Sequence, residues 1–153
     1  MPISAWSHLV SELAARGDGV RESGAFLLGQ TVKGRREAVR FAFYDDLEPG
    51  CLEAGYIIFT SVGYRKLWKI LKESGLQVVA DVHTHPGPPF QSPLDRDNPM
   101  MASSGHLAFI VPNYAQGRPQ PADVAYYTFL GNHQWSEVKP GPSAQKLYVG
   151  RWS

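Results

Sequence analysis

The stretch LQVVADVHTHPGPPFQSPLD, Leu76 to Asp95, changes character halfway along its length. Its first ten residues are almost continuously apolar until the end, as expected for a buried central β-strand. Its second half contains four prolines, which predict a stiff loop. Side chains two apart on a strand point to the same face, so His83 and His85 should leave the sheet together, with Thr84 on the other face.

Two neutral imidazoles at the end of a rigid strand are a natural pair of ligands for a metal such as zinc. A catalytic zinc usually takes three protein ligands and keeps its fourth position for water. Asp95 follows His85 by ten residues, and the intervening prolines reduce the entropic cost of returning its carboxylate to the strand end. Ser92 is close enough in sequence to share the site, and Asp97 is an alternative third ligand.

An isolated pair of histidines in HxH spacing is more often a surface pair than a metal site. HxHP at the end of an apolar strand, followed by SxxD, is a much more specific pattern. The single cysteine, Cys51, excludes an internal disulfide framework, a cysteine-based zinc site and the PCxxC motif of zinc deaminases. It also fits a reducing compartment, and we expect a cytoplasmic protein.

Together with an upstream glutamate in RESGAFLLG, the segments HTHP and SPLD resemble the motif of the JAMM (JAB1/MPN/Mov34) metalloprotease family. That motif has a glutamate in an E-x-x-G-hydrophobic-hydrophobic-G context, then HxHP and SxxD. The match spans roughly Glu22 to Asp95, and the next segment, HLAFIVPNYAQG, resembles the following strand of bacterial members. The family commonly has seven residues between the second histidine and the serine, whereas PGPPFQ supplies six here.

The resemblance implies that His83, His85 and Asp95 bind Zn²⁺, with water completing the site. It implies that Glu22 is the general base and that Ser92 helps to stabilise the oxyanion. By the same resemblance, the protein would be a zinc-dependent isopeptidase or peptidase that cuts after the C-terminal tail of a ubiquitin-like protein. The resemblance also implies activating (E1-like) or conjugating (E2-like) enzymes as further partners, and the chain is most similar to stand-alone bacterial members.

The remaining pattern predicts a single α/β domain over residues 1–153, with a mixed β-sheet flanked by helices. The resemblance implies the same MPN/JAB-like fold, which has a cytidine-deaminase-like architecture. Helical spacing and glycine stop signals predict two helices, and short apolar runs predict six strands. The expected helices are Ile3–Arg16 and Ser61–Ser74, with Ser61 as N-cap, and the expected strands are Gly24–Val32, Glu37–Asp45, Leu76–His85, His106–Tyr114, Asp123–Gly131 and Gln134–Val138. Residues 45–53 are expected to form a polar loop.

Other titratable residues have simpler interpretations. Asp81 shares a strand face with His83 and could orient an imidazole, although a surface or capping role is more common for such a residue. His8, His106 and His133 lack spaced partners, so we expect them to be surface residues or hydrogen-bonded core residues.

Three other functions remain open. An inactive MPN-type scaffold subunit would usually lack the ligand set, and a hydrolase of small peptide or amino-acid conjugates would keep it. A DNA-repair-associated JAB-like protein would need a basic surface. The formal charge of +1 gives no global attraction to nucleic acid or anionic lipid, so we expect neither a nucleic-acid nor a membrane partner. The basic residues that do cluster are Lys33, Arg35, Arg36 and Arg40, and Arg65, Lys66, Lys69 and Lys72 on the second helix.

Overall fold

Six β-strands form one mixed sheet at the centre of residues 1–142, the part of the chain that this computed structural model describes. The strand order across the sheet is β2-β1-β3-β4-β5-β6. The strands are β1 (Gly24–Val32), β2 (Arg35–Phe43), β3 (Gln77–Thr84), β4 (Leu107–Val111), β5 (Ala125–Gly131) and β6 (Gln134–Val138). The helices are α1 (Ile3–Gly17), α2 (Tyr44–Leu47), α3 (Ser61–Ser74) and α4 (Pro93–Asp97), with 3₁₀ turns η1 (Asn113–Ala115) and η2 (Pro121–Asp123). The predicted α/β fold with a mixed sheet and flanking helices is therefore confirmed.

Strand β3 lies in the interior of the sheet, as its apolar sequence predicts. It pairs antiparallel with β1 and parallel with β4, and its last six residues are buried. The strand ends at Thr84, one residue earlier than the sequence predicts, but the His85 backbone N–H still donates to the Val111 carbonyl across a gap of 3.0 Å. This bond keeps the backbone of the second histidine fixed to the end of the sheet.

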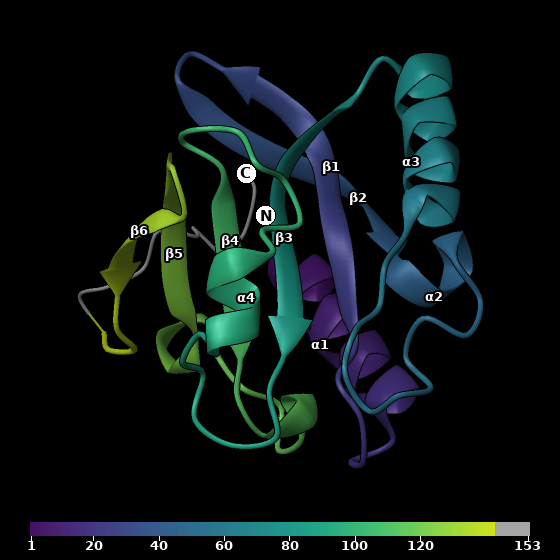
Figure 1. Cartoon of the computed structure of the whole chain (residues 1–153). Helices are drawn as coiled ribbons and strands as arrows, with labels where there is room; N and C mark the ends of the chain where they lie inside the picture. The colour runs from purple at the N-terminus through teal and green to yellow at the C-terminus, as the bar shows by residue number, and fades with distance from the viewer. Residues whose placement is uncertain (143–153) are drawn as a thin grey trace.

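Helices cover both faces of the sheet (Figure 1). Helix α1 packs on one face, where its apolar stripe of Trp6, Leu9, Val10 and Leu13 joins sheet residues in a core. Helices α2 and α3 pack on the opposite face around Phe26, and α4 lies on that same side in front of β3 and β4. Thr84 is buried toward α1, where its Oγ1 accepts from the Ser23 backbone N–H at 3.0 Å. The histidines therefore emerge on the α4 side, as the alternation along the strand predicts.

The structure corrects three local predictions. The expected polar loop at residues 45–53 begins inside the short helix α2, and Cys51 and Leu52 are buried in the core under α3. Helix α3 has its predicted bounds, but its N-cap is Thr60, whose hydroxyl accepts from the Val62 backbone N–H, and not Ser61. The proline-rich loop contains a short helix, α4, that hydrophobic periodicity could not reveal because the helix buries no residue.

The glycines of the first strand are needed where the sequence motif places them. A Cβ on Gly24 would lie 2.4 Å from the Tyr44 ring, and one on Gly29 would lie 1.8 Å from the Glu37 carbonyl oxygen. No helix among residues 1–142 is both long and apolar enough to cross a bilayer. The final segment LYVGRWS, for which the sequence favours neither a strand nor a tail, lies outside the described residues.

Candidate metal centre

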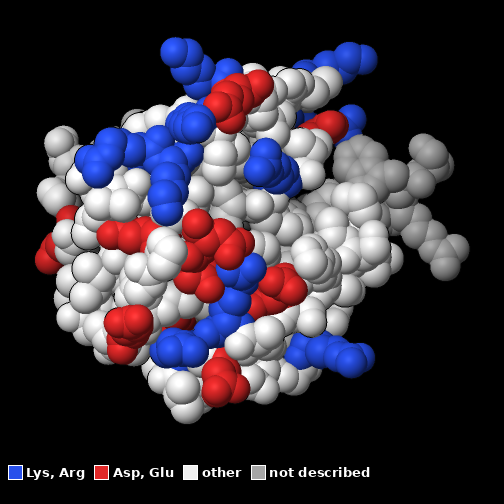
Figure 2. Space-filling view, turned by 90° about the vertical axis from the view of Figure 1, so that its right-hand side faces the viewer, with Lys and Arg blue, Asp and Glu red and all other residues white. Residues whose placement is uncertain are grey.

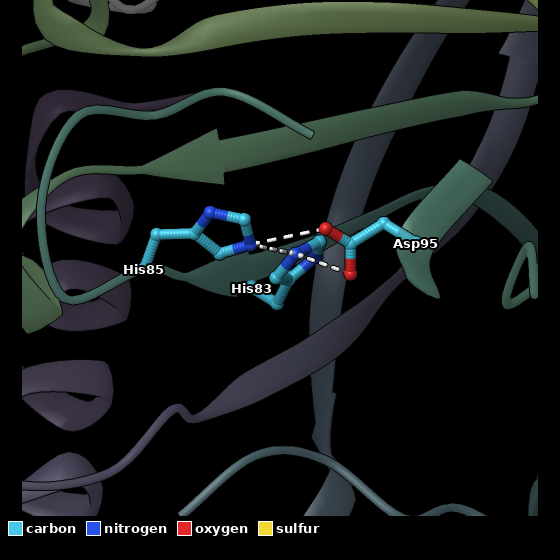
Figure 3. A group of neighbouring side chains, drawn as sticks. All are labelled: His83, His85 and Asp95. Carbon is cyan, nitrogen blue, oxygen red and sulfur yellow. Dashed lines mark hydrogen bonds and ion pairs between the residues drawn. The ribbon is translucent and has the colours of Figure 1, made fainter. Parts of the chain in front are cut away.

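His83, His85 and Asp95 converge on one point beside the end of β3 (Figure 3). The two Nε2 atoms are 3.0 Å apart. The Asp95 carboxylate reaches from α4, with Oδ1 at 3.5 Å from His83 Nε2 and Oδ2 at 3.2 Å from His85 Nε2. The structure thus brings together the three side chains that the sequence singles out as ligands.

These distances suit a small tetrahedral ion. Ligand atoms bound at about 2.0–2.1 Å in tetrahedral geometry lie about 3.3 Å from one another. The observed separations of 3.0, 3.2 and 3.5 Å bracket that value, and each imidazole presents Nε2 toward the shared point. The donor set therefore fits a tetrahedral metal ion with one position left for solvent or substrate.

Helix α4 owes its position to the sequence SPLD. Ser92 is the N-cap, and its Oγ accepts from the Asp95 backbone N–H at 3.2 Å. In return, Asp95 Oδ2 accepts from the Ser92 backbone N–H and from the Ser92 hydroxyl, both at 2.7 Å. This reciprocal capping box fixes the orientation of the carboxylate that faces the histidines. Asp97 is exposed and does not belong to the cluster, so the geometry favours Asp95 over it as the third ligand.

The charges and hydrogen bonds within the cluster shift the pKa values of Asp95 and His83 in opposite directions. Burial raises the pKa of the Asp95 carboxyl, but hydrogen bonds from His83, His85 and Ser92 outweigh it, and the pKa lies below its ordinary value. Burial acts to lower the pKa of His83, but the hydrogen bond and charge of Asp95 outweigh it and raise this pKa. The carboxylate is therefore held in its ionised form, which is the form that binds a cation.

Glu22 approaches the cluster from the segment between α1 and β1. Its Oε1 lies 3.9 Å from His85 Nε2, and its side chain is 18% exposed. The Glu22 backbone N–H donates to the Gly55 carbonyl at 2.9 Å, which fixes the residue beside the segment that follows α2. Burial raises the pKa of Glu22, opposed by the nearby His83 and His85. Glu22 is thus the acidic side chain next to the three ligand candidates without being one of them.

A second buried pair, which sequence reasoning missed, lies two residues along β3 from His83. Asp81 is 2% exposed, and its Oδ1 accepts from His106 Nε2 at 2.5 Å. The surface or capping role expected for Asp81 is therefore wrong, while His106 is one of the hydrogen-bonded core residues that the sequence allowed. A charged residue within an otherwise apolar strand was the available signal, but His106 is far enough along the chain that spacing alone could not pair them. Among the other histidines, His8 and His133 are exposed.

The cluster opens onto a pocket of about 540 Å³ on the α4 side of the sheet. Glu22, His83 and Asp95 line it, together with the segment Tyr56–Phe59 on one side and Trp135 on another. Gln91 also lines this pocket, and its carboxamide oxygen is buried without a hydrogen-bond partner among residues 1–142. Of the candidate ligands, His83 and Asp95 therefore face a pocket large enough for a small molecule or an extended peptide.

Comparison with known proteins agrees with this geometry. Residues 6–127 match the family described as prokaryotic homologs of the JAB domain. The chain belongs to this family. It is 35% identical over 74 residues to a protein of Sinorhizobium fredii (strain NBRC 101917 / NGR234) named "Probable metalloprotease y4jG". That match covers 48% of this JAB-domain chain and 44% of the relative, so the chain spans less than half the length of the relative.

Two solved structures share the fold. The solution structure of protein DSY2949 from Desulfitobacterium hafniense has a TM-score of 0.58 at 15% sequence identity, covering 86% of both chains. A solution structure of a protein from Salinibacter ruber has a TM-score of 0.53 at 18% identity, covering 92% of this chain and 94% of that one. At these identities the likeness shows the fold alone.

Proposed function

We propose that this JAB-domain protein is a zinc-dependent peptidase or isopeptidase. The observation that carries the proposal is the convergence of His83, His85 and Asp95 at tetrahedral spacing, with Glu22 Oε1 3.9 Å from His85 Nε2 and a pocket beside them. Two histidines and one carboxylate are a known ligand set of catalytic zinc sites. The metalloprotease name of the Sinorhizobium relative supports the same assignment.

A zinc ion held by these residues would supply a water whose pKa is lowered to about 7. Glu22 does not belong to the ligand cluster, so its carboxylate is free to accept a proton near the site and to return it to the leaving amine. Asp95 keeps its ionised carboxylate toward the histidines because Ser92 donates two hydrogen bonds to it. The role that the family resemblance implies for Ser92, stabilising charge on the attacked carbonyl, would require its hydroxyl to release Asp95 Oδ2, to which it donates at 2.7 Å.

For the substrate, we propose the C-terminal tail of a ubiquitin-like protein. The segment Tyr56–Thr60 lies next to Glu22 and belongs to no helix or strand. Its side chains alternate between exposed and half-buried, with Tyr56 46% and Ile58 47% exposed, which is the pattern of an extended strand. A peptide tail could add beside it through main-chain hydrogen bonds.

The distribution of surface charge does not favour the alternative of a nucleic-acid-binding protein. On the face that carries α2 and α3, basic side chains gather toward the upper part and acidic side chains occupy the centre (Figure 2). Arg16, for example, lies among acidic groups, with its Nη1 at 2.6 Å from Asp45 Oδ1 and 2.9 Å from Asp46 Oδ1. A duplex requires a continuous basic footprint, and this face carries both signs.

The test is cleavage of ubiquitin-like fusions that carry different C-terminal tails, comparing the wild type with Glu22→Ala. We expect about one zinc per chain in both proteins and a loss of turnover of about 10²–10⁴-fold in the variant, the usual contribution of a general base. The His83→Ala variant should lose the zinc itself. A free tail peptide serves as the second substrate. A hydrolase of small conjugates would cut the free peptide as well as the fusion, whereas the proposed enzyme should cut the fusion better.

Unchanged cleavage by Glu22→Ala would remove this residue from the mechanism. The wild-type protein should contain zinc after purification without chelators, or take it up when zinc is added. If it does neither, the zinc-dependent peptidase is refuted and the inactive scaffold subunit is favoured.

A further inference from the structure

Helix α4 carries Asp95, but no buried side chain of its own anchors the helix to the rest of the protein. It is five residues long, none of its residues is buried, and Leu94 on it is 53% exposed. A helix this short gains almost no stability from its own hydrogen bonds. The capping box orients Asp95 within α4, but it connects α4 to nothing else. Some contact outside the helix must therefore fix the carboxylate relative to the histidines on β3.

One such contact comes from β6. The Trp135 indole N–H donates to the Arg96 carbonyl oxygen at 3.2 Å, and Arg96 is the residue next to Asp95. The indole ring packs edge-on against Phe129 of β5, with ring centroids 4.9 Å apart and an interplanar angle of 63°. Trp135 is thus fixed by the sheet on one side and bonded to α4 on the other.

A second contact fixes the entry to α4. The Tyr127 hydroxyl on β5 accepts from the Gln91 backbone N–H at 3.2 Å and donates to Glu137 Oε1 at 2.8 Å. Gln91 directly precedes the N-cap Ser92, and Tyr127 is 1% exposed in the core. The β5–β6 hairpin therefore bonds to the backbone at two positions, Gln91 before Ser92 and Arg96 after Asp95.

We propose that the β5–β6 hairpin positions the third metal ligand, with Trp135 and Tyr127 as its positioning residues. The inference rests on the metal site of the proposed function. A ligand held in place before the ion arrives loses less conformational freedom on binding, which raises affinity. Trp135 lies beyond residues 6–127, the segment that matches the family, whereas Tyr127 is the last residue of that segment.

The experiment measures zinc affinity by competition with a chromophoric chelator and does not depend on any protease substrate. Trp135→Phe keeps an aromatic ring against Phe129 but removes the indole N–H, and Tyr127→Phe removes the hydroxyl. We expect each variant to bind zinc about 10-fold more weakly, the lower end of the effect of residues that orient metal ligands. Glu137→Gln keeps an acceptor for the Tyr127 hydroxyl and should stay within about 2-fold of wild type.

Trp68→Phe is the matched control, because Trp68 is 47% exposed and stacks on Tyr64 of α3. Its zinc affinity should equal that of the wild type. Thermal melting of the metal-free proteins separates positioning from general stability, and Trp135→Phe should melt within a few degrees of Trp68→Phe. Zinc affinity unchanged in both Trp135→Phe and Tyr127→Phe, or an equal loss in Trp68→Phe, would overturn the proposal. A wild-type protein that binds no zinc would instead overturn the proposed function.

Discussion

Removal of the His106 side chain should destabilise the protein far more than removal of an exposed histidine. Asp81 is 2% exposed, and His106 Nε2 is its hydrogen-bond partner on Oδ1. In His106→Ala the carboxylate would remain buried without this donor. Breaking a buried pair by removing one partner typically costs about 3–5 kcal/mol. Since a domain of this size has about 5–15 kcal/mol of total stability, the variant should lose a large share of it.

Equilibrium urea unfolding of the metal-free proteins measures this loss directly. The expected free-energy change of about 3–5 kcal/mol corresponds to a fall in melting temperature of about 6–20 °C for a chain of 150 residues or more. His8→Ala is the control, because His8 is exposed on α1, and its effect should stay within about 0.5 kcal/mol. The double variant D81L/H106L should recover most of the loss, because a buried pair can be replaced by apolar side chains at little cost.

If His106→Ala lowers the free energy of unfolding by less than about 1 kcal/mol, the reasoning is refuted. So small a loss would match an ordinary hydrogen bond between uncharged groups and not a buried carboxylate left without its donor. The same would follow if D81L/H106L were less stable than the summed effects of the single variants Asp81→Leu and His106→Leu predict, because the coupling between the two residues would then have the wrong sign.

Two further predictions concern a glycine of the sheet and two tyrosines, Tyr64 of α3 and Tyr127 of β5. Gly29→Ala should cost about 3 kcal/mol or more in urea unfolding, because its Cβ would lie 1.8 Å from the Glu37 carbonyl oxygen, whereas Gly87→Ala, with open space around it, should change little. Equal effects of the two substitutions would contradict this. Burial raises the pKa of Tyr64 and of Tyr127 from 10.0 to about 12. The unfolded chain releases these protons first, so their contribution to stability is complete below pH 10 and is lost as pH rises toward 12. Unfolding free energies that stay constant between about pH 9 and pH 11.5 would exclude this linkage.

The order of the six strands and the two long helices, and the ligand candidates, were determined by local sequence. The apolar run that ends in HTH required a buried strand with two imidazoles on one face, and the structure confirms both the strand and the shared face. The bounds of the helix Ser61–Ser74 were predictable because its apolar stripe and the glycine after it act within a few residues, although its N-cap is Thr60 and not Ser61. Such signals depend only on backbone geometry and near neighbours, which sequence spacing records.

What only the tertiary structure decided were contacts between residues far apart in the chain. Helix α4 could not be predicted from periodicity because it buries no side chain, and its support comes from Trp135 on another strand. The partnership of Asp81 with His106 depends on the parallel pairing of β3 with β4, which brings Asp81 opposite Ala108. Burial of both partners required a donor for the carboxylate, but which donor would face it was fixed only by strand register, a property of the folded sheet that no spacing along the chain encodes.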